Sequence, residues 1–190
     1  MRIGLFGGSF NPVHVGHIKT AEYALHERSL DKIIFIPAFI SPLKTSHSFI
    51  APRHRLNMIR LALQGKAQFD LSDIEIRREG ISYTIDTIDY FRKEYRYIDL
   101  IIGMDNLIVF DQWYKPDDLI TKVNLIILSR GDESGFKKNK YFEKAIFLNS
   151  PKIKISSSEI RRKIKQSESI KGLVPEEVEK YIINNKLYKD

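Results

Sequence analysis

The stretch that most restricts how this chain can fold is its beginning, where a short apolar run meets a helical pattern across a glycine-rich turn. Residues 2–6 (RIGLF) are typical of a strand. Ile18, Ala21 and Leu25 then recur at helical spacing. Between these two segments, residues 7–17 have the sequence GGSFNPVHVGH. The pattern therefore predicts a strand-to-helix turn, the unit from which α/β proteins are built.

The same turn has the chemistry of an anion-binding site. Adjacent glycines let the backbone approach a ligand closely and adopt dihedrals closed to other residues. The following helix directs its unpaired N–H groups at the same point. His14 and His17 lie in this turn, and imidazoles placed there can donate hydrogen bonds to phosphoryl oxygens. Two glycines alone could be an ordinary tight loop, but their combination with two histidines favours a phosphate site.

The rest of the chain alternates between apolar runs and helical patterns. Strands are predicted at 32–37, at 69–76 with a bend at residues 72–73, and then at 99–103, 124–128 and 145–148. Helices are predicted from Pro52 to near Gly65 and around residues 85–91. This alternation favours a parallel α/β sheet with right-handed crossovers, whose ligands collect at the carboxyl ends of the strands.

Length and composition narrow the function classes. With 190 residues and 43% hydrophobic composition, the chain can bury the core of one domain, 1–190. No window approaches the roughly 20 apolar residues of a membrane span, and no signal peptide is expected before the first strand. The absence of cysteine excludes disulfides and thiolate metal sites, which fits a cytoplasmic enzyme.

The formal charge of +7 is unevenly distributed. Residues 130–190 hold 15 Lys and Arg against 9 Asp and Glu, so +6 of the charge lies in the last third of the chain. Such a surface could attract nucleic acid or a small polyanion such as a nucleoside triphosphate. It could equally be a solvated lysine-rich surface. A polar stretch at 132–140 is predicted to be a surface loop.

A second candidate motif, ISSSEIR at residues 155–161, begins a helix. Ser156 and Glu159 match a capping box, which is a complete structural explanation. Serine hydroxyls and free N–H groups at a helix start can also bind phosphates, and Arg161 can add a permanently charged planar donor. Both interpretations stay open when this motif is considered alone.

Three shorter motifs complete the candidates. GISYT at residues 80–84 precedes a helix, with Thr84 as the predicted N-cap. Asp105 follows the strand at 99–103, where a carboxylate could accept from a ribose hydroxyl. Trp113 and Tyr114 lie in a polar segment, so either they pack in the core or an exposed ring stacks on a flat heterocycle.

Taken together, these motifs resemble the signatures of a known superfamily. The turn at 7–17 and the serine-rich helix start look like the two signatures of the nucleotidyltransferases related to class I aminoacyl-tRNA synthetases. With residues 80–84 and 113–114 added, nearly the whole chain is similar to the bacterial nicotinate-nucleotide adenylyltransferase family, including the ending at 173–182. The resemblance implies a Rossmann-like, doubly wound parallel sheet with helices on both faces and a small helical C-terminal part at about 156–190.

The resemblance also implies the reaction: transfer of the adenylyl group of ATP to nicotinate mononucleotide, giving deamido-NAD and pyrophosphate. The implied catalytic residues are His14, His17 and Arg161. Further ATP-binding residues would be Gly7, Gly8, Ser9, Phe10, Gly16, Gly103, Asp105, Ser156 and Ser157. The acceptor would be bound by Lys44, Ser82, Tyr83, Thr84, Trp113 and Tyr114, with Lys44 and the backbone of Ser9 and Phe10 receiving its phosphate.

The implied cofactor is Mg²⁺ carried in with ATP, since the sequence has no dedicated carboxylate cage. The expected partners are the two small-molecule substrates, without nucleic acid or membrane; a homo-oligomer is possible. The chain departs from the family pattern at two positions: Leu43 replaces a histidine before Lys44, and Ser158 replaces a threonine. The rival functions are a phosphopantetheine adenylyltransferase-like enzyme and, from another class, a basic nucleic-acid-binding protein.

Overall fold

The computed structural model describes residues 1–43, 50–129, 138–150 and 153–189. These residues form a six-stranded, wholly parallel sheet with the strand order β3-β2-β1-β4-β5-β6. The strands are β1 (Arg2–Gly8), β2 (Lys32–Pro37), β3 (Phe69–Leu71), β4 (Tyr97–Gly103), β5 (Asn124–Ser129) and β6 (Ala145–Asn149). The order reverses between β1 and β4, so a doubly wound Rossmann-like sheet is confirmed, and its switch point lies at the ends of these two strands.

Helices cover both faces of the sheet because each buried strand presents apolar side chains to both sides. One core cluster contains Phe6, Ile33 and Phe35, and α1 (Val15–Glu27), α2 (Pro52–Ala62), α7 (Ser157–Lys165) and α8 (Glu176–Asn184) pack against it. The opposite cluster contains Leu5, Ile34 and Leu100. It is covered by α4 (Thr84–Phe91), α5 (Met104–Ile108), α6 (Pro116–Lys122) and the 3₁₀ turn η2 (Phe142–Lys144).

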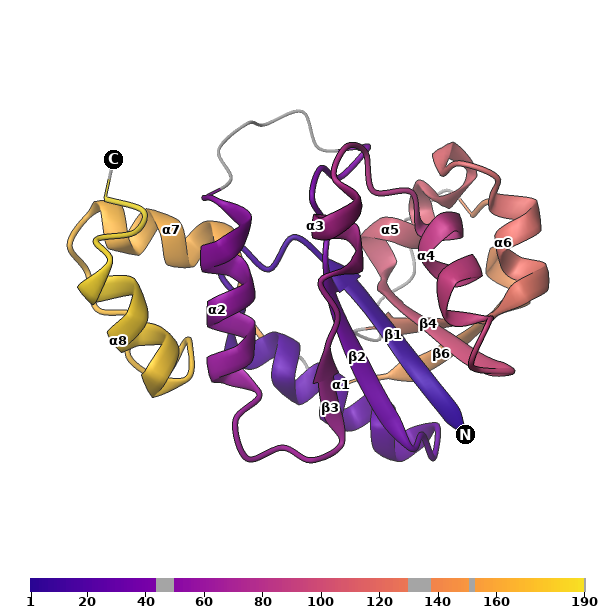
Figure 1. Cartoon of the computed structure of the whole chain (residues 1–190), viewed down its shortest axis with the longest axis horizontal. Coiled ribbons are helices and arrows are strands. Elements are labelled where there is room, and N and C mark those ends of the chain that lie inside the picture. Colours follow the sequence, from indigo (N-terminus) through magenta and orange to yellow (C-terminus); the bar gives the residue numbers. More distant parts are fainter. Residues whose placement is uncertain (44–49, 130–137, 151–152, 190) are drawn as a thin grey trace.

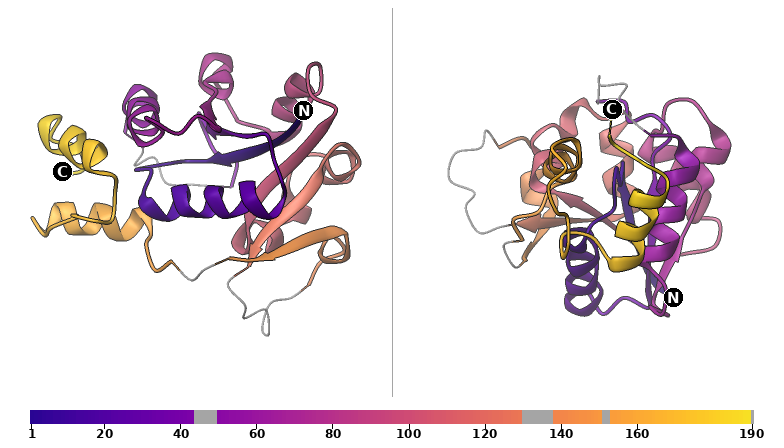
Figure 2. Two further views of the ribbon diagram at one scale, coloured as in Figure 1. Left: turned by 90° about the horizontal axis from the view of Figure 1, so that it is seen from below. Right: turned by 90° about the vertical axis from the view of Figure 1, so that its left-hand side faces the viewer.

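The C-terminal helices share the core of the sheet rather than forming one of their own. Ile160 of α7 and Val178 and Ile182 of α8 are buried in the same cluster as α1 and α2. Figure 1 shows α8 beside α2, on the side of the molecule away from α6, and the right-hand view in Figure 2 shows the same neighbourhood. We propose that residues 1–190 form one domain, because this shared core is what a single domain requires.

One predicted strand is wrong in part. The predicted strand at 69–76 ends at Leu71, and Ile74–Arg78 forms a short helix, α3. The alternation that suggested a strand fails because Glu75 is buried whereas Ile76 is only half-buried. An i,i+4 pair, in which Arg77 Nε donates to Asp73 Oδ1 at 2.7 Å, supports the helix instead.

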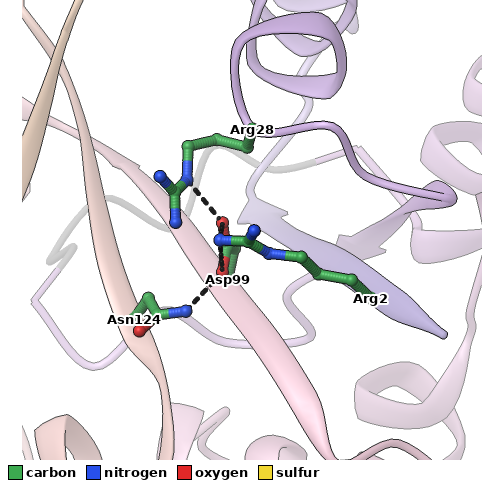
Figure 3. Close-up of polar contacts among 4 residues, drawn as sticks. All are labelled: Arg2, Arg28, Asp99 and Asn124. Atoms are coloured by element: carbon green, nitrogen blue, oxygen red, sulfur yellow. Dashed lines mark hydrogen bonds and ion pairs between the residues drawn. The ribbon is translucent and has the colours of Figure 1, made fainter.

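At the amino end of the sheet, a buried carboxylate joins four segments of the chain. Asp99 in β4 has no exposed surface. Arg28 Nε donates to Asp99 Oδ2 at 2.8 Å, Asn124 Nδ2 donates to Oδ1 at 2.7 Å, and Arg2 Nη2 lies 3.3 Å from Oδ2 (Figure 3). Because a buried charge is costly unless it is paired, this closed cluster fixes the ends of β1, α1 and β5 against β4.

Candidate active site

The glycine-rich turn lies at the carboxyl end of β1, beside the end of β4 at the switch point. Gly7 and Gly8 are the last residues of β1 and neither has a positive φ, so the predicted unusual glycine dihedrals are wrong. The small size of Gly8 matters instead, because a Cβ there would lie 3.1 Å from Cζ of Phe10. A Cβ at Gly7 would meet nothing within 4 Å, so the space beside Gly7 is open.

The left-handed residue of the turn is Phe10, with φ of 46°. Such a φ is a genuine outlier for a bulky side chain, and it persists only where the surroundings enforce it. The ring is 2% exposed and packs on three other rings, with its centroid 5.6 Å from those of Phe6 and Phe35 and 5.0 Å from that of His17. This aromatic cluster holds the turn in its strained shape.

His14 and His17 form a reciprocal cap at the start of α1. The Nδ1 atom of His14 accepts from the backbone N–H of His17 at 3.3 Å, and Nδ1 of His17 accepts from the N–H of His14 at 3.2 Å. The two rings are stacked, with centroids 3.6 Å apart. Gly16 is required beside them because a Cβ there would lie 2.9 Å from Nδ1 of His14.

This capping arrangement determines where each imidazole can donate. A ring nitrogen that accepts a hydrogen bond carries no hydrogen, so in each neutral ring the N–H is on Nε2. Both Nδ1 atoms are used by the helix start, so Nε2 is the atom through which each neutral ring can donate. The pair lies at a helix N-terminus, which itself favours an anion.

The second motif reaches the same turn from α7. Ser157 Oγ donates to the carbonyl of Pro12 at 2.9 Å, and Arg161 Nη1 donates to the carbonyl of Asn11 at 2.8 Å. Ser156 is the N-cap of α7, where its Oγ accepts from the N–H of Glu159 at 3.1 Å. The structure thus brings Ser157 and Arg161 to the His14–His17 turn, across about 150 residues of sequence, while Ser156 lies at the adjoining helix start.

The C-terminal tail closes this part of the site. Tyr188 Oη donates to Asn11 Oδ1 at 2.8 Å. Burial raises the pKa of the Tyr188 phenol, against the lowering effect of the Arg161 and Arg55 charges. The phenol is therefore neutral and able to donate at physiological pH.

At the end of β4, Gly103 is followed by the predicted ribose acceptor, Asp105. Gly103 is the N-cap of α5, and a Cβ there would lie 2.5 Å from Oδ1 of Asp105. Glycine is therefore the residue that leaves room for this carboxylate. Asp105 is exposed and Asn106 Nδ2 donates to its Oδ1 at 3.3 Å, which leaves other lone pairs available.

The predicted acceptor residues gather on the other side of the switch point. The rings of Tyr83 and Tyr114 lie 4.6 Å apart, and Tyr114 is 48% exposed. Trp113 is half-buried against Phe110, at 4.9 Å between ring centroids. Thr84 is the first residue of α4 and Tyr83 occupies the N-cap position, so the predicted cap at Thr84 is wrong by one residue because Thr84 is already helical.

Ser82 ties this acceptor segment to the loop after β2. Its Oγ accepts from the N–H of Phe39 at 2.9 Å, and its N–H donates to the carbonyl of Ile40 at 2.9 Å. Beneath it, burial raises the pKa of Glu75, although hydrogen bonds from Thr87 and Ser82 lower it. Lys44 lies outside the described residues, as does most of the predicted loop at 132–140.

Sequence reasoning missed one buried charge close to the turn. Arg55 in α2 is 1% exposed, and burial lowers the pKa of its guanidinium. Its donors bond the carbonyls of Ser9 at 3.0 Å and Ala38 at 2.6 Å. The sequence signal that could have revealed a buried Arg55 is helical spacing, because Arg55 shares the buried face of α2 with Met58, Ile59 and Ala62.

Within the parts of the chain that the structure describes, no group of three or more His, Asp or Glu residues could hold a metal ion. Over the same residues, none of the helices has the length and apolar character that crossing a membrane requires.

Comparison with known proteins agrees with this geometry. Residues 5–163 match the cytidylyltransferase-like family. A probable nicotinate-nucleotide adenylyltransferase from Dictyoglomus thermophilum is 42% identical over 195 residues, which cover 99% of this chain and all of that protein. One from Clostridium tetani is 40% identical, over 97% of this chain and 98% of that protein. The chain belongs to the nicotinate-nucleotide adenylyltransferase family.

Solved structures agree on the fold. The nicotinic acid mononucleotide adenylyltransferase of Plasmodium falciparum, complexed with NaAD, superposes with a TM-score of 0.80 at 22% identity, covering 98% of this chain and 97% of that one. The solved structure therefore shows the same fold, and the sequence relatives show that the chain is a nucleotidyltransferase.

Proposed function

We propose that the protein transfers the adenylyl group of ATP to nicotinate mononucleotide, releasing pyrophosphate and forming deamido-NAD. The observation that carries this proposal is the stacked pair of His14 and His17, whose Nδ1 atoms cap the N-terminus of α1 next to the carboxyl end of β1. Family membership supplies the substrate names.

The chemistry needs alignment and charge stabilisation rather than a base. The attacking oxygen belongs to the mononucleotide phosphate, which is already ionised at neutral pH. As it bonds to the α-phosphorus of ATP, the bond from that phosphorus to the bridging oxygen of pyrophosphate breaks, and pyrophosphate carries the electron pair away. The Nε2–H groups of His14 and His17 would stabilise the charge on the transferring phosphoryl group.

Ser157 and Arg161 would bind the β and γ phosphates. In the described structure they donate to the carbonyls of Pro12 and Asn11, so they already lie at the turn that would hold the triphosphate. We propose that Gly103 and Asp105 at the end of β4 receive the adenosine part of ATP. Mg²⁺ would be bound chiefly by the ATP phosphates and would neutralise part of their charge.

The acceptor base would lie at the Tyr83–Tyr114 pair, with Trp113 stacking on the pyridine ring. The N-terminus of α4 and the backbone at Tyr114 would donate to the nicotinate carboxylate. A helix terminus favours an anion by about 0.3–2 kcal/mol, and an amide N–H₂ facing donors adds an unsatisfied-group cost of about 1–3 kcal/mol. The acid should therefore be preferred over the amide by about tenfold to several thousandfold.

Pyrophosphate release from ATP with a panel of acceptors tests this proposal. Nicotinate mononucleotide should give the highest kcat/KM, nicotinamide mononucleotide a lower one, and phosphopantetheine none. Trp113→Ala should raise the KM for the acceptor while the KM for ATP stays the same. Equal efficiency with acid and amide would overturn the base-recognition site. Pyrophosphate release only with phosphopantetheine would favour the rival enzyme, and salt-sensitive RNA retention without any pyrophosphate release would favour the nucleic-acid-binding rival.

A further inference from the structure

We infer that Arg55, which does not touch substrate in the proposed reaction, is the positioning residue for the mononucleotide phosphate. This inference rests on the proposed function and adds a role that the family signatures do not contain. Arg55 projects from the apolar face of α2 and is 1% exposed. Because a buried charge is costly unless it is paired, the carbonyls that Arg55 contacts are needed to stabilise it.

The decisive contact is with the peptide unit between Ser9 and Phe10. Arg55 Nη1 donates to the carbonyl of Ser9 at 3.0 Å. In a planar trans peptide the N–H points opposite to the C=O. Arg55 donates to the Ser9 carbonyl from the side of α2, so this carbonyl points toward α2. The N–H of Phe10, on the opposite side of the same peptide, therefore points away from α2. The family resemblance implies that this N–H receives the mononucleotide phosphate.

The same guanidinium fixes the neighbouring loop in a matching way. Arg55 Nη1 also donates to the carbonyl of Ala38 at 2.6 Å. The N–H of that peptide unit, Phe39 N–H, donates on its far side to Ser82 Oγ at 2.9 Å. The Ala38–Phe39 peptide therefore has Arg55 as the donor to its carbonyl and Ser82 as the acceptor from its N–H. At the Ser9–Phe10 peptide, the phosphate would be the acceptor.

Two further observations agree with this role. Phe10 has a φ of 46°, so the orientation of its peptide is one the chain would not adopt unaided. A charged donor on a carbonyl also polarises the peptide and strengthens its N–H as a donor, as in other chains of hydrogen bonds. Arg55 thus both orients and strengthens the Phe10 N–H without approaching the phosphate itself.

The test compares Arg55→Lys with Arg60→Lys, a change of the same type at an exposed position of the same helix. Lysine keeps the charge but loses the planar guanidinium, whose Nη1 donates to both carbonyls and whose Nη2 lies 3.5 Å from the carbonyl oxygen of Phe39. We expect Arg55→Lys to raise the KM for nicotinate mononucleotide about tenfold or more, with the KM for ATP within about twofold of wild type. Arg60→Lys should change neither value.

A binding comparison isolates the phosphate. Wild-type protein should bind nicotinate mononucleotide more tightly than the phosphate-free nicotinate riboside, and Arg55→Lys should reduce that ratio about tenfold. An unchanged ratio, or equal rises in both KM values, would overturn the inference, because either result means that Arg55 acts only on general structure.

A third measurement needs no variant. In wild-type protein, the amide resonance of Phe10 should shift on titration with nicotinate mononucleotide but not with the riboside, and absence of that shift would overturn the inference even if the variants fail to fold. Failure of the proposed function is distinguishable, since wild-type protein would then release no pyrophosphate with this acceptor.

Discussion

The two ends of the sheet use buried polar groups in opposite ways. At the amino end, Arg2, Arg28 and Asn124 all donate to the enclosed Asp99 carboxylate (Figure 3). At the carboxyl end, the histidine pair and Arg55 bond the backbone of the turn that we propose binds the phosphates.

The amino end of the sheet therefore contributes mainly to stability, and the carboxyl end contributes mainly to the proposed reaction. The amino-end cluster stabilises the fold because its donors pair with a carboxylate that has no exposed surface. At the carboxyl end, bonds to the backbone hold the two imidazole rings and the Ser9–Phe10 peptide in fixed orientations, which pre-organises the turn for an incoming anion. Variants at the amino end should therefore change unfolding, and variants at the carboxyl end should change turnover.

The largest expected effect is on stability, at Asp99. Asp99→Ala leaves the half-buried Arg28 charge without its carboxylate, and we expect the free energy of unfolding to fall by about 3–5 kcal/mol. Chemical denaturation measures this loss. Asp89→Ala is the matched control, since Asp89 forms an exposed ion pair with Lys122, and its removal should cost less than about 1 kcal/mol. A tenfold loss of kcat in folded Asp99→Ala protein would contradict the expectation that variants at the amino end change stability and not turnover.

The next effect is on turnover, at His17. His17→Ala removes one Nε2–H donor from the transferring phosphoryl group, and kcat should fall by about a hundredfold or more. Stability should fall by only about 1 kcal/mol, because one cap contact is lost. His26→Ala, at the exposed far end of the same helix, should match wild type in steady-state assays. Near-normal kcat in His17→Ala would remove this histidine from the mechanism.

A smaller effect is expected at Arg161. Arg161→Lys loses the planar fork, and kcat/KM for ATP should fall by about tenfold, the size of one charge-assisted hydrogen bond. Arg162→Lys provides the comparison, since Arg162 pairs with Glu168 on the exposed side of α7. If both variants have the kinetics of wild type, Arg161 serves only to hold the Asn11 carbonyl.

The smallest effect separates capping from phosphate binding at Ser156. Ser156→Ala should lower the free energy of unfolding by about 1 kcal/mol, whereas Ser156→Gly should lower it by only a few tenths, because glycine is tolerated at an N-cap. Thermal denaturation and ATP kinetics are measured on both variants. If Ser156→Gly has nearly the stability of wild type but a lower kcat, the hydroxyl binds phosphate. If both its stability and its kcat are close to those of wild type, Ser156 is only a cap.

The fold was largely predictable from the sequence because buried parallel strands and their helices have distinct periods. The runs at 32–37 and 124–128 were located to within one residue, and the run at 99–103 to within two. The predicted strand at 69–76 was wrong at its second half, because the local i,i+4 pair between Asp73 and Arg77 outweighed an apparent alternation of isoleucines.

The position of the candidate site was predictable, but its internal geometry was not. The sequence indicated that residues 7–17 form a phosphate-binding turn, since glycines and histidines stand together there. Nothing local indicated that Phe10 rather than a glycine has the positive φ, because that conformation is imposed by Phe6 and Phe35 packing on its ring. The role of Arg55 was equally hidden, since its carbonyl acceptors come from two other segments of the chain.

The contacts between the C-terminal tail and the N-terminal turn also have a consequence for the order of synthesis. Tyr188 bonds Asn11 across 177 residues, and the N–H of Val15 donates to the carbonyl of Leu173 at 3.0 Å. Chains emerge from the ribosome N-terminus first, so residues 7–17 are made before Leu173 and Tyr188 and must wait for them before these contacts can form. A chain interrupted during translation after β6 would contain all six described strands and yet lack both contacts.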